Sequence, residues 1–212
     1  MEARIQTLKL KKEEEKRANE FISIIQLDLY KKPIELTLFS GEQIEDCAFI
    51  GKKYLIRVNR FPARMTKIGT SSFKNCVALT SIAEIPATCI SWGENVFMDN
   101  ISLVSCPNLP PGLTEIKKNT FRNCKSMVLE EGFQFPTGLN SIGEYSFCET
   151  AIRFLPPLPK KTLILEGAFC GCQKLLTVAN FPARLKIISA YSFCHCRRLT
   201  ELPSFPEKLN TM

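Results

Sequence analysis

The residues best suited to chemistry in this 212-residue sequence are its ten cysteines, which occur beside a single histidine. The densest group lies in two short motifs, FCGC at 169–172 and FCHC at 193–196. If the two motifs lie on neighbouring turns of the chain, their thiols would be close enough for a disulfide, and thiolate clusters also suit zinc. The candidate metal ligands are Cys170, Cys172, Cys194 and Cys196.

The spacing of the cysteines favours a simpler interpretation. Four of them follow a phenylalanine by three residues, and three follow a phenylalanine directly. A cysteine at a fixed position of a repeat is most simply a small hydrophobe that fills a tight turn. Side chains one and three residues after the phenylalanine should also point in different directions. We therefore expect reduced thiols and no metal, with a zinc site and a disulfide as the alternatives.

The remaining composition argues against catalysis and against cofactors. One histidine leaves no room for a two-histidine metal site, and no phosphate-binding loop of the G-x-x-x-x-G-K type is present. The formal charge is +7, but the basic pairs fall at differing positions rather than along one stripe with exposed aromatics. The sequence therefore predicts a non-enzymatic protein with no small-molecule substrate, and it disfavours nucleic acid as a partner.

The elements that position the cysteines follow from a repeat of phenylalanine every 22 to 26 residues. The repeated residues are Phe49, Phe73, Phe97, Phe121, Phe147, Phe169 and Phe193. A unit this short cannot close a hydrophobic core by itself, so each unit must bury its apolar side against its neighbours. The chain is therefore predicted to be a solenoid of about seven coils.

A proline follows each of these phenylalanines by 12 to 15 residues, and aliphatic residues recur between them. The unit reads L-x-x-I-x-x-(I/F)-P-x-x-L-x-x-I-x-x-x-x-F-x-x-C-x-x, best seen at 67–86 and 185–206. This pattern resembles the BspA-like class of leucine-rich repeats over roughly residues 40 to 212, with insertions near 130–134 and a shortened unit at 151–168. The resemblance implies a right-handed solenoid with short parallel strands on one face and a turn-rich far side.

Two domains are expected. Residues 1–35 form a charged segment with an amphipathic helix from about residue 2 to 27, and residues 36–212 form the repeat solenoid, whose last repeat is incomplete. The helix could cap the first coil, dock on a partner or pair as a short coiled coil, or fray. Residues 34–39, IELTLF, alternate like a strand and could begin the stack ahead of the first full repeat.

The outward residues of the predicted strands are the expected partner-binding surface. Several are apolar where polar side chains are the rule, which marks interaction sites, although single exposed apolar residues are common. The candidates are Ile56, Arg57, Arg60, Glu84, Val104, Arg153, Phe154, Leu176, Asn180 and Glu201.

The carboxyl end is expected to expose an apolar edge, because the eighth unit stops before a polar closing segment. The residues at this edge are Leu202, Phe205, Leu209 and Met212. We expect a protein partner, or a second copy of the chain, to cover it.

The function predicted from these features is a scaffold-like protein-interaction module. The alternative is a structural component of a larger assembly, such as a viral particle or a protist surface or adhesion protein, since relatives with such repeats include microbial surface proteins. No signal peptide and no transmembrane segment is recognisable, which predicts a cytoplasmic location, or a place within a virion or larger particle.

Overall fold

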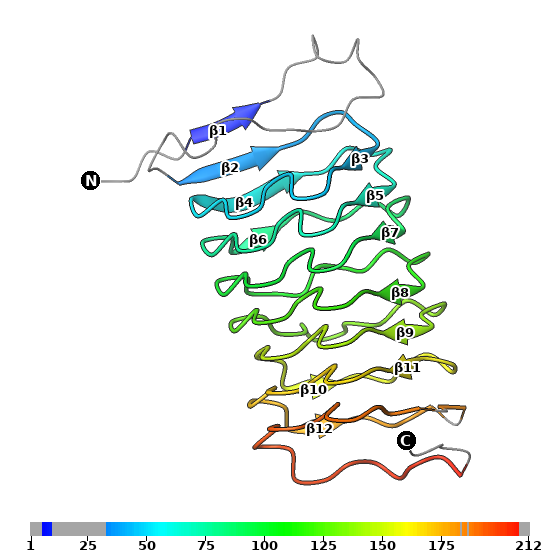
Figure 1. Ribbon diagram of the computed structural model, residues 1–212. Helices are drawn as coiled ribbons and strands as arrows, with labels where there is room; N and C mark the ends of the chain where they lie inside the picture. Colours follow the sequence, from blue (N-terminus) through cyan, green and yellow to red (C-terminus); the bar gives the residue numbers. More distant parts are fainter. Residues whose placement is uncertain (1–5, 10–32, 183, 186, 208–212) are drawn as a thin grey trace.

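The computed structural model describes residues 6–9, 33–182, 184–185 and 187–207. In these residues the chain winds into a stack of short coils, one coil for each repeat (Figure 1). The paired strands of neighbouring coils are all parallel. The repeat of phenylalanines therefore predicts the architecture correctly, as a parallel solenoid.

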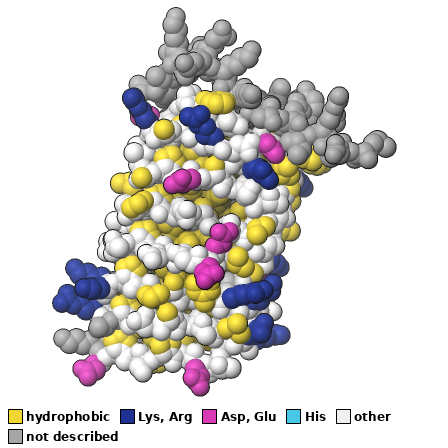
Figure 2. All heavy atoms as spheres, turned by 180° about the vertical axis from the view of Figure 1, so that it is seen from behind, with side chains coloured by type: hydrophobic (Ala, Val, Ile, Leu, Met, Phe, Trp, Pro, Cys, Tyr) yellow, Lys and Arg dark blue, Asp and Glu magenta, His cyan; other side chains and the backbone are white. Residues whose placement is uncertain are grey.

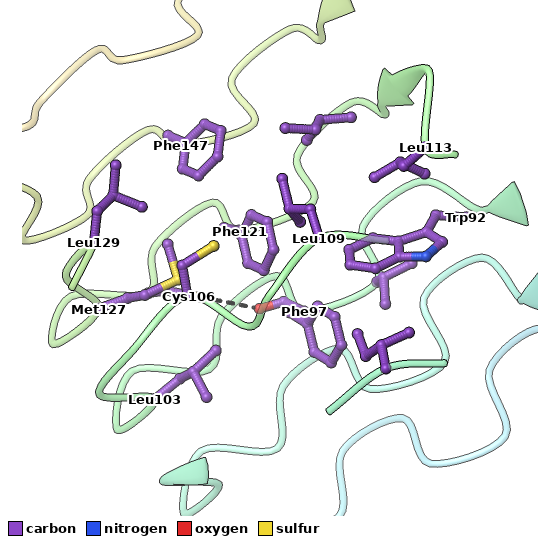
Figure 3. Packing of buried hydrophobic residues seen from close by; sticks show 14 of the residues in the cluster. Trp92, Phe97, Leu103, Cys106, Leu109, Leu113, Phe121, Met127, Leu129 and Phe147 are labelled. Carbon is purple, nitrogen blue, oxygen red and sulfur yellow. Dashed lines mark hydrogen bonds between the residues drawn. The ribbon is translucent and has the colours of Figure 1, made fainter. Parts of the chain in front are cut away.

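The repeated phenylalanines form one continuous column inside the stack. Six of the seven are fully buried, and Phe193 is partly buried at the last rung. Successive ring centroids lie 4.9 to 5.6 Å apart, and successive ring planes are within 28° of parallel. Figure 3 shows Phe97, Phe121 and Phe147 in this column, with Trp92 turned edge-on toward Phe97 at 6.0 Å. Burial and stacking of these rings hold neighbouring coils together.

The first strand ladder uses the L-x-x-I stretch that follows each phenylalanine. Its strands are β2 (Ile34–Thr37), β4 (Leu55–Arg60), β6 (Ser81–Ile82), β10 (Phe154–Leu155) and β12 (Thr177–Val178). In β4, Leu55 and Val58 are buried while Arg57, Asn59 and Arg60 are exposed. The expected strand at 34–39 is confirmed as β2, since Ile34, Leu36 and Leu38 are buried.

A second strand ladder lies on the other side of the coil, where we expected only turns (Figure 1). It consists of two three-stranded sheets, and β7 and β8 do not pair with each other. The first sheet contains β3 (Gln43–Ile44), β5 (Lys67–Ile68) and β7 (Ser91–Trp92), and the second contains β8 (Glu115–Ile116), β9 (Ser141–Ile142) and β11 (Leu163–Ile164). The expectation was incomplete because the second L-x-x-I stretch, after the proline, also alternates a partly exposed residue with a buried one. The proline separates the two strands without ending the pairing of its coil with the next.

The turn-rich side is the third side of the coil, from two residues before each phenylalanine to two residues after it. The two flanking residues adopt a left-handed conformation in every coil, as at Ser71 (φ 55°) and Asn75 (φ 59°) around Phe73. The N–H groups of these three residues donate to carbonyls of the next coil at 2.8 to 3.0 Å. Asn, Asp and Gly tolerate this conformation best and hold eight of the 14 flanking positions, which explains their recurrence here. We call this side the turn ladder.

At residues 6–9 the structure has a strand instead of the expected amino-terminal helix. Gln6–Lys9 forms strand β1, which pairs in parallel with β2 in the register Gln6 to Ile34. An unpaired β2 would leave a row of main-chain donors and acceptors at the end of the first ladder, and β1 satisfies them. The rest of the expected helix lies outside the described residues, and the described residues contain no helix. The division of the chain at residue 35 stays a prediction.

The first ladder is interrupted in the middle of the stack. An isolated bridge joins Ser105 to Val128, and the next strand, β10, pairs with β12. The extra residues of the coil form a turn, in which the N–H of Phe133 donates to the carbonyl of Glu130 at 3.0 Å. Strand β10 ends at Leu155 because Pro156 and Pro157 have no N–H to donate.

Candidate functional site

The residues predicted to form a partner surface lie on the outer side of the first ladder. Eight of the ten are exposed, and Ile56 and Phe154 are half-buried. Val104 is 54% exposed and Leu176 is 41% exposed, which are high values for aliphatic side chains in an otherwise tightly packed stack. Phe154 differs from the expectation, because it packs against the core.

Four outward residues of successive coils are aligned by main-chain hydrogen bonds. The N–H of Thr80 donates to the carbonyl of Ile56 (2.9 Å), that of Val104 to Thr80 (3.1 Å) and that of Val128 to Val104 (2.9 Å). We name these four residues, Ile56, Thr80, Val104 and Val128, the strand-face stripe. Three of them are aliphatic, so the stripe presents apolar surface with Val104 as its most exposed aliphatic side chain.

Leu176 is separated from the stripe by the interruption of the first ladder. Its N–H donates to the carbonyl of Arg153 at 2.8 Å, so these two predicted residues are neighbours. Between them and Val128, the chain turns inward at Ile152, which is fully buried. The ten predicted residues therefore form two groups rather than one continuous footprint.

Charged side chains surround the strand-face stripe without forming one basic face. The guanidinium of Arg60 lies over the ring of Phe39, 5.5 Å from its centroid, and Asn59 donates a hydrogen bond to the carboxylate of Glu35 at 2.9 Å. Figure 2 shows hydrophobic side chains interspersed across one face, with lysines and arginines gathered at both edges of its C-terminal half.

The four cysteines that lie three residues after a repeated phenylalanine act as buried hydrogen-bond donors. The thiol of Cys124 donates to the carbonyl of Phe97 at 3.1 Å, and the thiols of Cys76, Cys172 and Cys196 repeat this contact with the phenylalanine of the preceding coil at 3.1 to 3.2 Å. Desolvation by burial raises the pKa of Cys124 and of Cys172. Burial therefore favours the protonated thiols of Cys124 and Cys172, each of which donates to a buried carbonyl.

The cysteines directly after the phenylalanine form a second column. Cys148 is buried, and Cys170 and Cys194 are partly exposed. Burial raises the pKa of Cys148 to about 12 and, with the neighbouring Cys194 as a smaller cause, raises that of Cys170. All ten cysteines lie in the described part of the chain, and none of them forms a disulfide there.

The four cysteines considered as metal ligands thus belong to two different columns. Among the described residues, no group of three or more His, Cys, Asp or Glu side chains is arranged to hold a metal ion. The spacing placed the cysteines on neighbouring coils, and the two columns agree with the expectation that side chains one and three residues after the phenylalanine point in different directions.

The repeats match one family model. The model describes a BspA type leucine rich repeat region in six copies, and it matches residues 33–153 and 129–212. The chain belongs to the BspA-type leucine-rich repeat family. No curated protein sequence matches it significantly.

The solved structures similar to this BspA-type chain are leucine-rich repeat proteins. The T. pallidum Leucine Rich Repeat protein (TpLRR) is 25% identical with a TM-score of 0.67, over 80% of this chain and 79% of that chain. A leucine-rich repeat protein from Bacteroides ovatus is 16% identical with a TM-score of 0.38, over 83% and 73%. A leucine rich cell surface protein from Faecalibacterium prausnitzii is 14% identical with a TM-score of 0.35, over 82% and 80%.

The predicted C-terminal edge of this BspA-type chain is described as far as Glu207. Leu202 is 40% exposed, and Phe205 is 54% exposed while its ring stacks on Phe181 at 5.4 Å. Leu209 and Met212 lie outside the described residues. Within the described ranges, no helix has the length and hydrophobicity required to cross a membrane.

Sequence reasoning missed a groove beside Phe154. Two signals in the sequence pointed to it: the extra residues at 130–134 and the run LPPLPKK at 155–161, whose three prolines have no main-chain N–H to donate.

Proposed function

We propose that this BspA-type repeat chain is a non-enzymatic protein-interaction module that binds a partner through the strand-face stripe. The observation that carries the proposal is the exposure of Val104, at 54%, within an aligned row that also contains Ile56 and Val128. A few well-packed residues near the centre of an interface supply most of its binding free energy, whereas exposed charges at its rim supply little.

The fold supports this proposal because a solenoid presents a broad, rigid surface. The coils are fixed to one another by the phenylalanine column, by the turn ladder and by the paired strands of the two ladders. A partner that binds such a surface meets side chains that are already ordered, so little conformational entropy is lost on that side of the interface.

The test is affinity capture of partner proteins by the full-length chain in its native cells. Capture by the wild-type chain is compared with capture by a variant that carries both Thr80→Asp and Val104→Asp. Both positions are exposed, so the fold should be retained while the stripe becomes charged. We expect capture to fall at least about 10-fold, as for loss of a hot-spot contact.

The matched control is Ile50→Asp with Ile101→Asp. These isoleucines are 44% and 42% exposed and lie outside the strand-face stripe, Ile50 on the turn ladder and Ile101 two residues after its end at Asp99. Partners that are captured equally by wild type and the stripe variant would refute binding through the stripe. A cytoplasmic location and a second copy at Leu202 and Phe205 remain further parts of the proposal, as does the alternative role in a larger assembly.

A further inference from the structure

A groove with a volume of about 910 Å³ lies between two successive proline turns of the stack, those of Pro136 and Pro159. One wall comes from residues 132–140, the other from residues 154–161, and β12 contributes Thr177. Clefts of roughly 300 to 1,000 Å³ are the usual size of ligand sites in proteins, so the groove is large enough to be one.

The groove lies beside a position where one main-chain bond between coils is missing. The N–H of Ala179, directly after β12, donates to the carbonyl of Leu155 at 2.9 Å, but Pro156, directly after β10, has no N–H to donate in the same way, and the preceding coil carries an extra turn at Glu130. The same position of the repeat is closed elsewhere. A Cβ added at Gly112 would lie 2.8 Å from Ile90, whereas one added at Gly138 would meet no atom within 4 Å.

The lining combines aromatic and proline surface with two positive charges. The rings of Phe133 and Phe135 pack edge-to-face with their centroids 5.2 Å apart, and Phe154 lines the groove from the other coil. Lys160 and Lys161 are exposed at one end, and neither forms an ion pair with another residue of the described chain. No aspartate or glutamate is among the lining residues, although Glu130 and Glu131 precede Gly132 on the neighbouring turn.

The lining also contains polar side chains suited to a peptide backbone. Gln134, Thr137 and Asn140 are exposed along one wall, and Thr177 is exposed on the adjacent coil. Amide and hydroxyl groups donate and accept hydrogen bonds, and they can replace the main-chain donors that the prolines lack. Grooves lined by aromatic residues are a recurrent way of binding extended peptide segments.

We propose that this groove binds an extended segment of a partner protein in which an aromatic or aliphatic anchor lies next to acidic residues. The anchor occupies the apolar floor beside Phe133 and Phe154, and the acidic residues meet Lys160 and Lys161. The inference rests on the proposed function as a protein-interaction module, but it uses a surface separate from the strand-face stripe.

Selection of phage-displayed random dodecapeptides on the full chain tests the proposal, because the selection works for a partner of any identity. Selected peptides are synthesised with fluorescein and titrated by fluorescence polarisation. We expect the enriched sequences to combine Phe, Trp or Leu with Asp or Glu. We also expect their affinity to fall about 10-fold or more when Lys160→Glu and Lys161→Glu are combined, with a clear weakening as the salt concentration rises.

Gly138→Trp is the decisive variant, because its side chain enters open space and fills the groove. We expect it to abolish binding of the selected peptides without lowering the midpoint of thermal unfolding. Thr137→Trp, at an exposed position of the same wall, is a second blocking variant if the first does not fold. The matched controls are Arg64→Trp, at the position of Gly138 three coils earlier, and Arg197→Glu with Arg198→Glu, and both should bind normally.

Three results would overturn the proposal: enriched peptides that are neutral or basic, peptides that still bind when the groove is blocked, or a selection that yields no groove-dependent peptide. Displacement of the selected peptides by decanoate at a similar concentration would also overturn it, in favour of a small amphipathic anion. The stripe variant Thr80→Asp with Val104→Asp should still bind these peptides. Peptide binding therefore tests the groove, whereas capture of partner proteins by the stripe variant tests the proposed function, and either can fail without the other.

Discussion

The phenylalanine column predicts that stability is coupled between neighbouring coils and not between distant ones. Phe147 stacks on Phe121 at 5.3 Å and on Phe169 at 5.5 Å, and Phe135 packs edge-on against it at 6.2 Å. Phe169 stacks on Phe147 and Phe193. Leucine at either position would keep most of the buried apolar area but remove the ring contacts.

The magnitude follows from the number of ring pairs lost. An aromatic pair contributes about 0.5 to 1.5 kcal/mol beyond its buried area. Phe169→Leu removes two pairs and should lower the free energy of unfolding by about 1 to 3 kcal/mol. Phe147→Leu removes three pairs and should cost about 1.5 to 4.5 kcal/mol.

The informative quantity is the coupling energy from a double-mutant cycle. Phe147 and Phe169 share one ring contact, so the double variant should lose about 0.5 to 1.5 kcal/mol less than the sum of the single losses. Phe73 and Phe169 are four rungs apart and share none, so their losses should add within about 0.3 to 0.5 kcal/mol.

Urea unfolding followed by circular dichroism, with the fluorescence of the buried Trp92 as a second probe, provides the free energies. If the slope of the unfolding free energy against urea concentration is unchanged, the substitutions act on the stability of the folded stack. Equal coupling for the neighbouring and the distant pair would refute the column as a chain of nearest-neighbour contacts.

Two further predictions concern the buried thiols. Cys124→Ala should lower the free energy of unfolding by about 1 to 3 kcal/mol, because the carbonyl of Phe97 loses its donor, whereas Cys124→Ser keeps a donor and should lose less; equal losses in urea titrations would contradict this role. Burial raises the pKa of Cys89 from 9.0 to about 12, so its contribution to stability is present below pH 9 and is lost as the pH rises from 9 toward 12. The unfolding free energy should therefore fall over this range, less steeply in Cys89→Ala, and an equal fall in both proteins would exclude Cys89 as a source.

The sequence predicted the fold class because the repeat is a property of residue spacing. Each rung of the column needs a large flat side chain at the same position of each coil, and Phe49 to Phe193 show that requirement directly. The second strand ladder was missed because two-residue strands such as Glu115–Ile116 are too short for their sequence pattern to be distinguished from that of a turn. Strand β1 was missed because the charged segment around it follows a helical spacing, while pairing with β2 decides its conformation.

The extent of the candidate binding surfaces depended more on the tertiary structure than on the sequence. The sequence identified Val104 and Leu176 as outward-facing, and both are exposed. It could not show that Leu176 is separated from the strand-face stripe, because this follows from the inward turn at Ile152. It also could not show that Phe154 packs against the core beside a groove, since that depends on how far two proline turns stand apart.

By itself, the sequence determined that the chain is a stack of repeats and which residues fill its interior, because a short unit must bury its apolar side chains against copies of itself. Only the tertiary structure decided where the stack is imperfect. An added turn at Glu130 and a proline directly after β10 fall on two neighbouring coils, and the groove between Gly138 and Lys161 lies where these two irregular segments meet.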